Sequence, residues 1–202
     1  MPTTMPKTPS AAASPAGPAR KVWTRSDCEH LERTGFPNYE HLELVEGELI
    51  NRMGKKRPHV NAQGYVLKWA FGDEFVNSEA PIDVSPEDNP TSEPVPDLIV
   101  LNKPTCQVSA ENALPGDLRL VIEVSDTTLR HDLTQKAGLY ARVGIVEYWV
   151  LDVTDRRPFV HREPLAGKYQ SITEYAEHES VAPLAAPDAA FLVSSAFSAP
   201  LP

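Results

Sequence analysis

The sequence predicts a single α/β domain in which helices flank a mixed central β-sheet and a β-hairpin precedes that sheet. Three observations support this fold class. Short runs of apolar and β-branched residues recur beyond residue 79 and are typical of strands. A helically spaced apolar stripe at 129–142 separates two of these runs, as in a parallel crossover. The chain has 202 residues, of which 41% are hydrophobic and 23% charged, so it can bury one core.

The ends of the chain differ from its middle. Residues 1–20 are almost wholly Pro, Ala, Ser, Thr and Gly, a composition that cannot bury enough apolar surface to offset its ordering entropy. We therefore expect a disordered tail over 1–20, one folded domain over 21–195 and a flexible C-terminus over 196–202.

Two elements are expected before the main sheet. Residues 26–29 match a capping box, which predicts a short helix over 27–33. Within 41–51, two apolar stretches are separated by Glu46 and Gly47, a pattern that suits a hairpin with a tight loop.

Helices and strands then alternate. A helix is expected from Pro58 to about Phe75, because proline is well tolerated at the first helical position and apolar residues follow at helical spacing. The stripe at 129–142 predicts another helix, ended by Gly144. Strands are expected at 80–84, 96–101, 118–125, 146–153, 157–162 and 169–175. The last two should be antiparallel, which makes the sheet mixed.

Glu123 interrupts an otherwise apolar strand. The run LRLVIEVS at 118–125 has the composition of a strand that is covered on both faces. Burying an unpaired carboxylate is costly, so Glu123 there needs a counter-charge or a metal. The alternative is an edge strand with Glu123 on its solvent side. Asp97, at the start of PDLIVL (96–101), is a weaker candidate because Asp is ordinary at strand ends.

Lys136 falls within the apolar stripe of the predicted helix at 129–142. A helix advances about 100° per residue, which places Lys136 on the same face as Leu129, Leu133 and Tyr140. We expect that face to meet the sheet, where an ammonium needs carboxylates to stay charged. In the alternative interpretation, Lys136 pairs with Asp132 on a solvated face or its stem snorkels to water.

Converging Asp, Glu and Lys side chains suit metal-assisted phosphodiester hydrolysis. Hard divalent cations such as Mg²⁺ take carboxylate and water oxygens. A nearby lysine can steady the attacking hydroxide or the developing oxyanion. His59, in the first turn of a predicted helix, could act there as acid, base or ligand, although a surface or core histidine is the commoner outcome. Glu43, Glu46 and Glu48 flank the hairpin, where most acidic residues are simply solvated.

Charge and cysteines limit the function classes. A net charge of −9 rules out an argument for nucleic-acid binding from total charge, although a local basic groove stays open. Basic residues cluster before His59 and form either a phosphate-contacting loop or a solvated turn; they are Arg52, Lys55, Lys56 and Arg57. Cys28 and Cys106 match no metal-ligand spacing and should be free thiols. With no secretory signal or bilayer-spanning run, we expect a cytoplasmic protein.

The segment EVSDTTLRHDLTQKAGLYARVGIVEYWVLD at 123–152 closely resembles the core of the Uma family, a bacterial family within the PD-(D/E)xK nuclease superfamily. Further matches are ELVEGELI at 43–50, Pro58-His59 at a helix start and Pro96-Asp97, so the resemblance covers roughly residues 24–175. It implies a restriction-endonuclease-like core.

The resemblance also assigns residues to roles. Asp97 would be the aspartate of the PD element and Glu123 the acidic member of the second element. The superfamily's lysine position, two residues later, is Ser125 here. Members of this family are thought to supply the lysine from the following helix, and Lys136 is the residue that matches.

The leading functional hypothesis is an endonuclease that uses Mg²⁺ or Mn²⁺ to cut DNA. Asp97 and Glu123 would bind the metal, Lys136 would position the attacking water, and His59 would belong to the same site. The alternative from another class is a catalytically inactive nuclease-fold module that binds nucleic acid or a protein partner. Hydrolysis of another phosphate ester would use the same residues, and a homodimer stays open.

Overall fold

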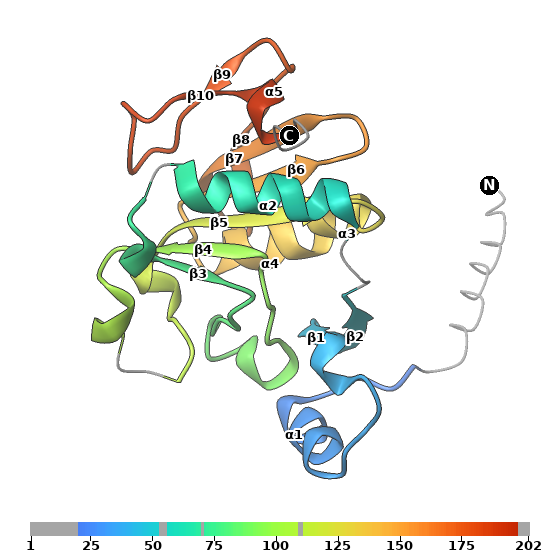
Figure 1. Ribbon diagram of the computed structural model, residues 1–202. Coiled ribbons are helices and arrows are strands. Elements are labelled where there is room, and N and C mark those ends of the chain that lie inside the picture. Colours follow the sequence, from blue (N-terminus) through green and yellow to red (C-terminus); the bar gives the residue numbers. More distant parts are fainter. Residues whose placement is uncertain (1–19, 53–55, 70, 109–110, 198–202) are drawn as a thin grey trace, which may run out of the picture.

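A six-stranded mixed β-sheet organises the fold (Figure 1). The computed structural model describes residues 20–52, 56–69, 71–108 and 111–197. The strands lie in the order β3 (Val76–Ser78), β4 (Leu98–Leu101), β5 (Leu118–Ser125), β6 (Glu147–Asp152), β7 (Arg157–Leu165) and β8 (Lys168–Glu174). Only the β5–β6 pair in this sheet is parallel; the other neighbours are antiparallel. The predicted mixed sheet is therefore confirmed.

Helices cover both faces of this sheet (Figure 1). On one face, α2 (Arg57–Trp69) and α5 (Val193–Ala196) pack over alternate apolar residues of the central strands, including Leu120, Ile122 and Trp149. On the other face, the crossover helices pack over the intervening residues, including Val121 and Tyr148. Because successive strand residues point to opposite faces, Glu123 lies on the same face as Val121, under the crossover helices.

The crossover between β5 and β6 contains a π-helical turn. It runs as α3 (Leu129–His131), a π-helical segment (Asp132–Lys136) and α4 (Ala137–Arg142). The predicted helix spans the right residues, but it is not regular. Gly144 follows it with a φ of +81°, which confirms the predicted glycine stop. Both Asp132 and Lys136 are buried.

The predicted hairpin is confirmed as β1 (Leu42–Val45) and β2 (Glu48–Asn51). Glu46 and Gly47 have φ values of +48° and +79°, as in the mirror-image turns that suit two-residue hairpin loops. The hairpin contacts the segment before β4 through a bridge between Leu44 and Glu93. A further short pair, β9 (Ser180–Val181) and β10 (Phe191–Leu192), was not predicted.

Several predicted boundaries are wrong. Helix α1 spans Arg25–Arg33, and its capping box joins Thr24 and Asp27 rather than residues 26–29. Helix α2 ends at Trp69 instead of Phe75, since Gly72 has an extended backbone. Short 3-10 helices are Tyr39–His41, Asp73–Phe75, Asn89–Thr91, Thr105–Gln107 and Pro115–Asp117.

The strand predicted at 80–84 is also wrong. The edge strand β3 precedes it, and Glu79 has a left-handed φ of +53°, which ends the extended backbone. Ile82 makes only an isolated bridge to Ala113. Pro81 could donate no ladder hydrogen bond.

The predicted flexible ends fall outside the described residues, apart from Arg20 and residues 196–197. Cys28 and Cys106 are free, as expected. In the part of the chain that the structure describes, no helix has the length and apolar character to cross a bilayer.

Candidate functional site

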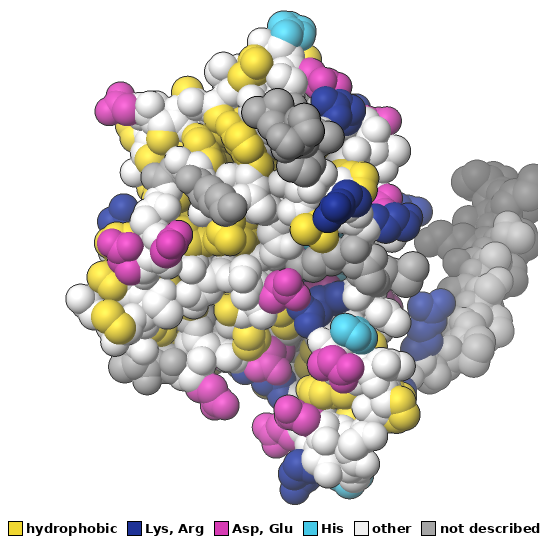
Figure 2. Space-filling model, viewed as in Figure 1, with side chains coloured by type: hydrophobic (Ala, Val, Ile, Leu, Met, Phe, Trp, Pro, Cys, Tyr) yellow, Lys and Arg dark blue, Asp and Glu magenta, His cyan; other side chains and the backbone are white. Residues whose placement is uncertain are grey.

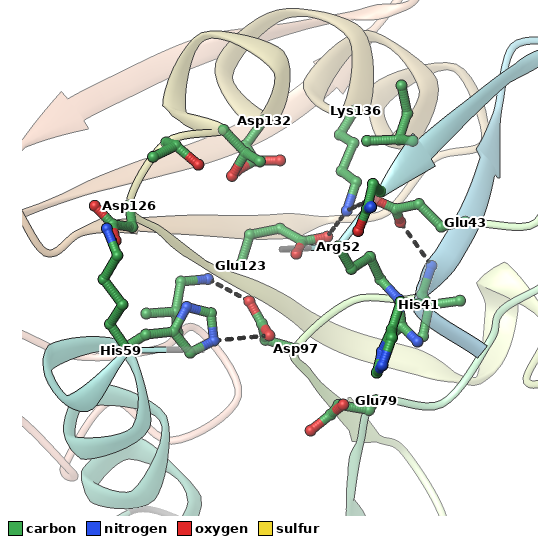
Figure 3. Close-up of a pocket in the computed structure, with 17 residues that line it drawn as sticks. His41, Glu43, Arg52, His59, Glu79, Asp97, Glu123, Asp126, Asp132 and Lys136 are labelled. Carbon is green, nitrogen blue, oxygen red and sulfur yellow. Dashed lines mark hydrogen bonds and ion pairs between the residues drawn. The ribbon is translucent and has the colours of Figure 1, made fainter. Parts of the chain in front are cut away.

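A cavity of about 210 Å³ brings together all four candidate residues (Figure 3). Asp97, Glu123, Lys136 and His59 line it. Its walls come from the β1–β2 hairpin, the first turn of α2, the end of β5 and the crossover helices. Segments that are far apart in sequence therefore meet at one point.

Lys136 is the buried cation of the site, with 3% of its side chain exposed. Its Nζ lies 2.8 Å from Glu123 Oε1 and 2.9 Å from Glu43 Oε1. Burial alone would lower the pKa of Lys136, but the two carboxylates outweigh it and hold the pKa above its ordinary value. The inward orientation predicted from the helical projection is confirmed, and the solvated pairing with Asp132 is wrong.

Asp132 instead accepts two hydroxyl hydrogen bonds. Ser125 Oγ donates to Asp132 Oδ2 at 2.6 Å, and Thr128 Oγ1 donates to the same atom at 2.7 Å. These bonds tie the π-helical turn to the end of β5. They hold Asp132 beside the cavity, where its charge acts on Glu123 and Lys136.

Glu123 is buried in the central strand, so the edge-strand alternative is wrong. Its Oε1 accepts hydrogen bonds from Lys136 Nζ and, at 3.1 Å, from the Tyr140 hydroxyl. Burial raises the pKa of Glu123 well above its ordinary value; Lys136 opposes this shift, and Asp132, Asp97 and Glu43 add to it. The carboxylate cluster, defined as Glu43, Asp97, Glu123 and Asp132, thus holds more negative charge than Lys136 neutralises.

Asp97 lies beside Glu123 because of strand register. Leu98 pairs with Ile122 in the antiparallel β4–β5 ladder, so Asp97, directly before β4, lies opposite Glu123 on β5. The Val124 backbone N–H donates to Asp97 Oδ2 at 2.7 Å. His59 Nε2 lies 3.1 Å from Asp97 Oδ1, and the two side chains are 11% and 13% exposed. Helix α2 therefore contributes a histidine that contacts the aspartate directly.

Glu43 was missed by the sequence reasoning, which expected the acidic residues of the hairpin to be solvated. Glu46 and Glu48 are exposed as expected. Glu43 has only 4% of its side chain exposed, and its Oε2 accepts the Val95 N–H at 3.1 Å. A usable signal was present, since Glu43 interrupts an apolar strand just as Glu123 does.

The rim of the cavity carries both signs of charge. Lys56 Nζ lies 3.0 Å from Asp126 Oδ2. Arg52 donates to the Glu40 carbonyl at 2.7 Å. Of the other basic residues in the predicted cluster, Arg57 is exposed and Lys55 lies outside the described residues.

The donor set fits a hard divalent cation that keeps water ligands. Within the described ranges, no group of three or more His, Cys, Asp or Glu side chains is arranged to hold a metal. Mg²⁺, however, is usually bound by one or two carboxylates, several waters and substrate phosphates. Asp97 and Glu123 could supply two such carboxylates. The excess negative charge of the carboxylate cluster favours a cation at this position.

Comparisons with known proteins agree with this fold. A sequence-family model described as "Uma2: Putative restriction endonuclease" matches residues 26–194. The chain is also similar to a crystal structure described as a "putative nuclease belonging to DUF820" from Anabaena variabilis, with a TM-score of 0.58 and 18% sequence identity. That similarity covers 82% of this chain and 95% of the other, and at this identity it shows the fold alone. No curated protein matches the chain.

Proposed function

We propose, since this chain belongs to the Uma2 family, that it is a Mg²⁺- or Mn²⁺-dependent endonuclease that hydrolyses phosphodiester bonds of DNA. The observation that carries the proposal is the buried Lys136 ammonium, 2.8 Å from Glu123, in the cavity that also holds Asp97. A lysine without a function is seldom buried in this way, because desolvating an ammonium is costly.

Asp97 and Glu123 are the residues that would hold the metal. Both carry carboxylates and both line the cavity, Glu123 from β5 and Asp97 from the position directly before β4. When bound, the ion supplies charge neutralisation for the phosphate and lowers the pKa of water. The Val124 N–H and His59 fix the Asp97 carboxylate, so this ligand is positioned in advance.

Lys136 is proposed to position the attacking water and to stabilise charge that develops on the phosphate. Its contacts with Glu43 and Glu123 keep it protonated and restrict its side chain to the cavity. His59 is proposed to orient Asp97 through its 3.1 Å contact.

The test is cleavage of plasmid and single-stranded DNA with Mg²⁺ or Mn²⁺ by wild type, Asp97→Ala and Lys136→Ala. We expect metal-dependent cutting by wild type and a loss of about 100-fold or more in each variant, the usual scale for removing a charge-stabilising group. Circular dichroism of each variant checks that it is folded.

Matched controls are Glu48→Gln on the exposed side of the hairpin and Lys168→Ala on β8, which should cut like wild type. Calorimetry should show Mg²⁺ binding to wild type and none to Asp97→Ala. Metal-dependent cutting that survives both site substitutions would overturn the assignment. DNA binding without a Mg²⁺ site and without cutting would indicate the inactive binding module instead.

A further inference from the structure

The groups proposed for catalysis lie at the bottom of the cavity. Side-chain exposure is 5% for Glu123 and 3% for Lys136. It reaches only 13% for Asp97. Reacting atoms must come within about 3–3.5 Å of one another. The scissile phosphate therefore has to enter the cavity.

The cavity is small for a double helix. Its volume is about 210 Å³, below the roughly 300–1,000 Å³ of typical small-molecule pockets. Glu43 on β1 and Arg52, directly after β2, lie on one side, and α2 places His59 on the other (Figure 3). Duplex DNA is stiff, so fitting one of its phosphates between these walls costs the energy of bending the helix. A single strand turns freely about its backbone and avoids that cost.

Positive charge at the rim is limited. Apart from Lys136 at the floor, the lysine and arginine side chains that line the cavity within the described residues are Arg52 and Lys56. Asp126 and Glu79 line the same rim. Duplex-binding surfaces are strongly positive, since each phosphate contact uses a cation. Figure 2 shows Lys and Arg scattered among Asp and Glu on the face drawn, without a continuous basic patch.

The rim of the cavity also carries an aromatic side chain, the imidazole ring of His41. The His41 side chain is 60% exposed and lines the cavity near Arg52 (Figure 3). Bases that are not stacked in a duplex bind proteins by stacking on aromatic side chains, histidine included. Rings beside a few cations are typical of single-strand binding sites.

We propose that this cavity binds a single strand of DNA rather than the double helix. Arg52 and Lys56 contact the phosphates next to the scissile one, and the His41 ring stacks on a neighbouring base. This inference rests on the proposed function and names its substrate class.

The test is fluorescence anisotropy with a labelled oligonucleotide, single-stranded or annealed to its complement. Binding is measured in a Ca²⁺ buffer at a series of salt concentrations. The length of the recovered DNA is then checked to show that it was not cut. Wild type should bind the single strand about tenfold more tightly than the duplex. Two phosphate contacts predict a slope of log K against log salt of roughly −1.4 for the single strand.

Variants assign the contacts. Arg52→Gln and Lys56→Gln should each reduce the magnitude of the slope by about 0.7. His41→Ala should weaken binding about tenfold and leave the slope unchanged. Arg33→Gln and His30→Ala, at exposed positions on α1, are matched controls and should bind like wild type.

Equal or tighter duplex binding would overturn the inference, and so would a slope near −6 or steeper, which indicates many phosphate contacts. Single-strand preference without Mg²⁺-dependent cutting would support the inference and overturn the proposed function. Mg²⁺-dependent cutting with a duplex preference would support the proposed function and overturn the inference. Failure to bind either form would overturn the inference.

Discussion

Replacement of Lys136 by methionine tests the charge balance of the buried site. Methionine keeps most of the side-chain length and removes the ammonium. Glu43 and Glu123, each at most 5% exposed, then lose the cation that lies within 2.9 Å of both. Breaking a buried ion pair by removing one partner typically costs about 3–5 kcal/mol. A domain has only about 5–15 kcal/mol of total stability, so the loss is easily measured.

The loss should depend on pH in a defined direction. Burial already raises the pKa of Glu123 above its ordinary 4.5 in the wild type, and removing Lys136 raises it further. The folded state therefore holds a proton more tightly than the unfolded state. Stability linked to such a group is complete below the unfolded-state pKa and is lost as pH rises through the folded-state pKa. Lys136→Met should thus lose more stability near pH 8 than near pH 5.

Urea unfolding followed by tryptophan fluorescence, to which the buried Trp149 contributes, measures the free energy of unfolding at both pH values. The double variant Glu43→Gln/Lys136→Met should recover part of the loss, because one stranded carboxylate is gone. Lys168→Ala is the control and should unfold like wild type. A loss at pH 5 equal to that at pH 8, or wild-type stability at both, would refute the reasoning.

Three further predictions concern the same structure. Tyr140→Phe removes the 3.1 Å hydrogen bond to Glu123 and should lower the free energy of unfolding in urea by about 1–2 kcal/mol. An unchanged urea midpoint would contradict that contact. Mg²⁺ binding should release protons and tighten as pH rises, because the ion replaces a proton held by the carboxylate cluster; calorimetry in buffers of different ionisation enthalpy checks this, and no proton release would contradict it. Gly47→Ala should lower the free energy of unfolding by about 1 kcal/mol or more, because φ is +79° and the added Cβ would lie 2.5 Å from Val22. In α2, the Cβ added by Gly64→Ala meets open space, so this substitution should raise the melting temperature.

The parts of the site that the sequence could predict are those set by local periodicity. The apolar run of β5 indicated a strand covered on both faces, and Glu123 stood out within it. The helical projection placed Lys136 inward before any contact was known. Each prediction needs only the residues within one element.

The parts that could not be predicted depend on tertiary contacts. Asp97 owes its position to the β4–β5 register and to the Val124 N–H. The burial of Glu43 depends on how the hairpin docks against the segment before β4, and no local pattern sets that docking. The edge strand formed at 76–78 rather than at 80–84, because Glu79 adopts a left-handed backbone that propensity does not register.

The π-helical turn makes the crossover sensitive to length. A π turn contains one residue more than an α turn, so the helix changes phase between Asp132 and Lys136. Asp132 is fixed to the end of β5 by Ser125 and Thr128, while Lys136 is fixed to Glu123. A substitution between Asp132 and Lys136 leaves these two side chains on their present faces of the helix. Deleting or inserting a residue there would rotate one of them by about 100° relative to the other. The number of residues between Glu123 and Lys136 therefore matters more to the site than the identity of those residues.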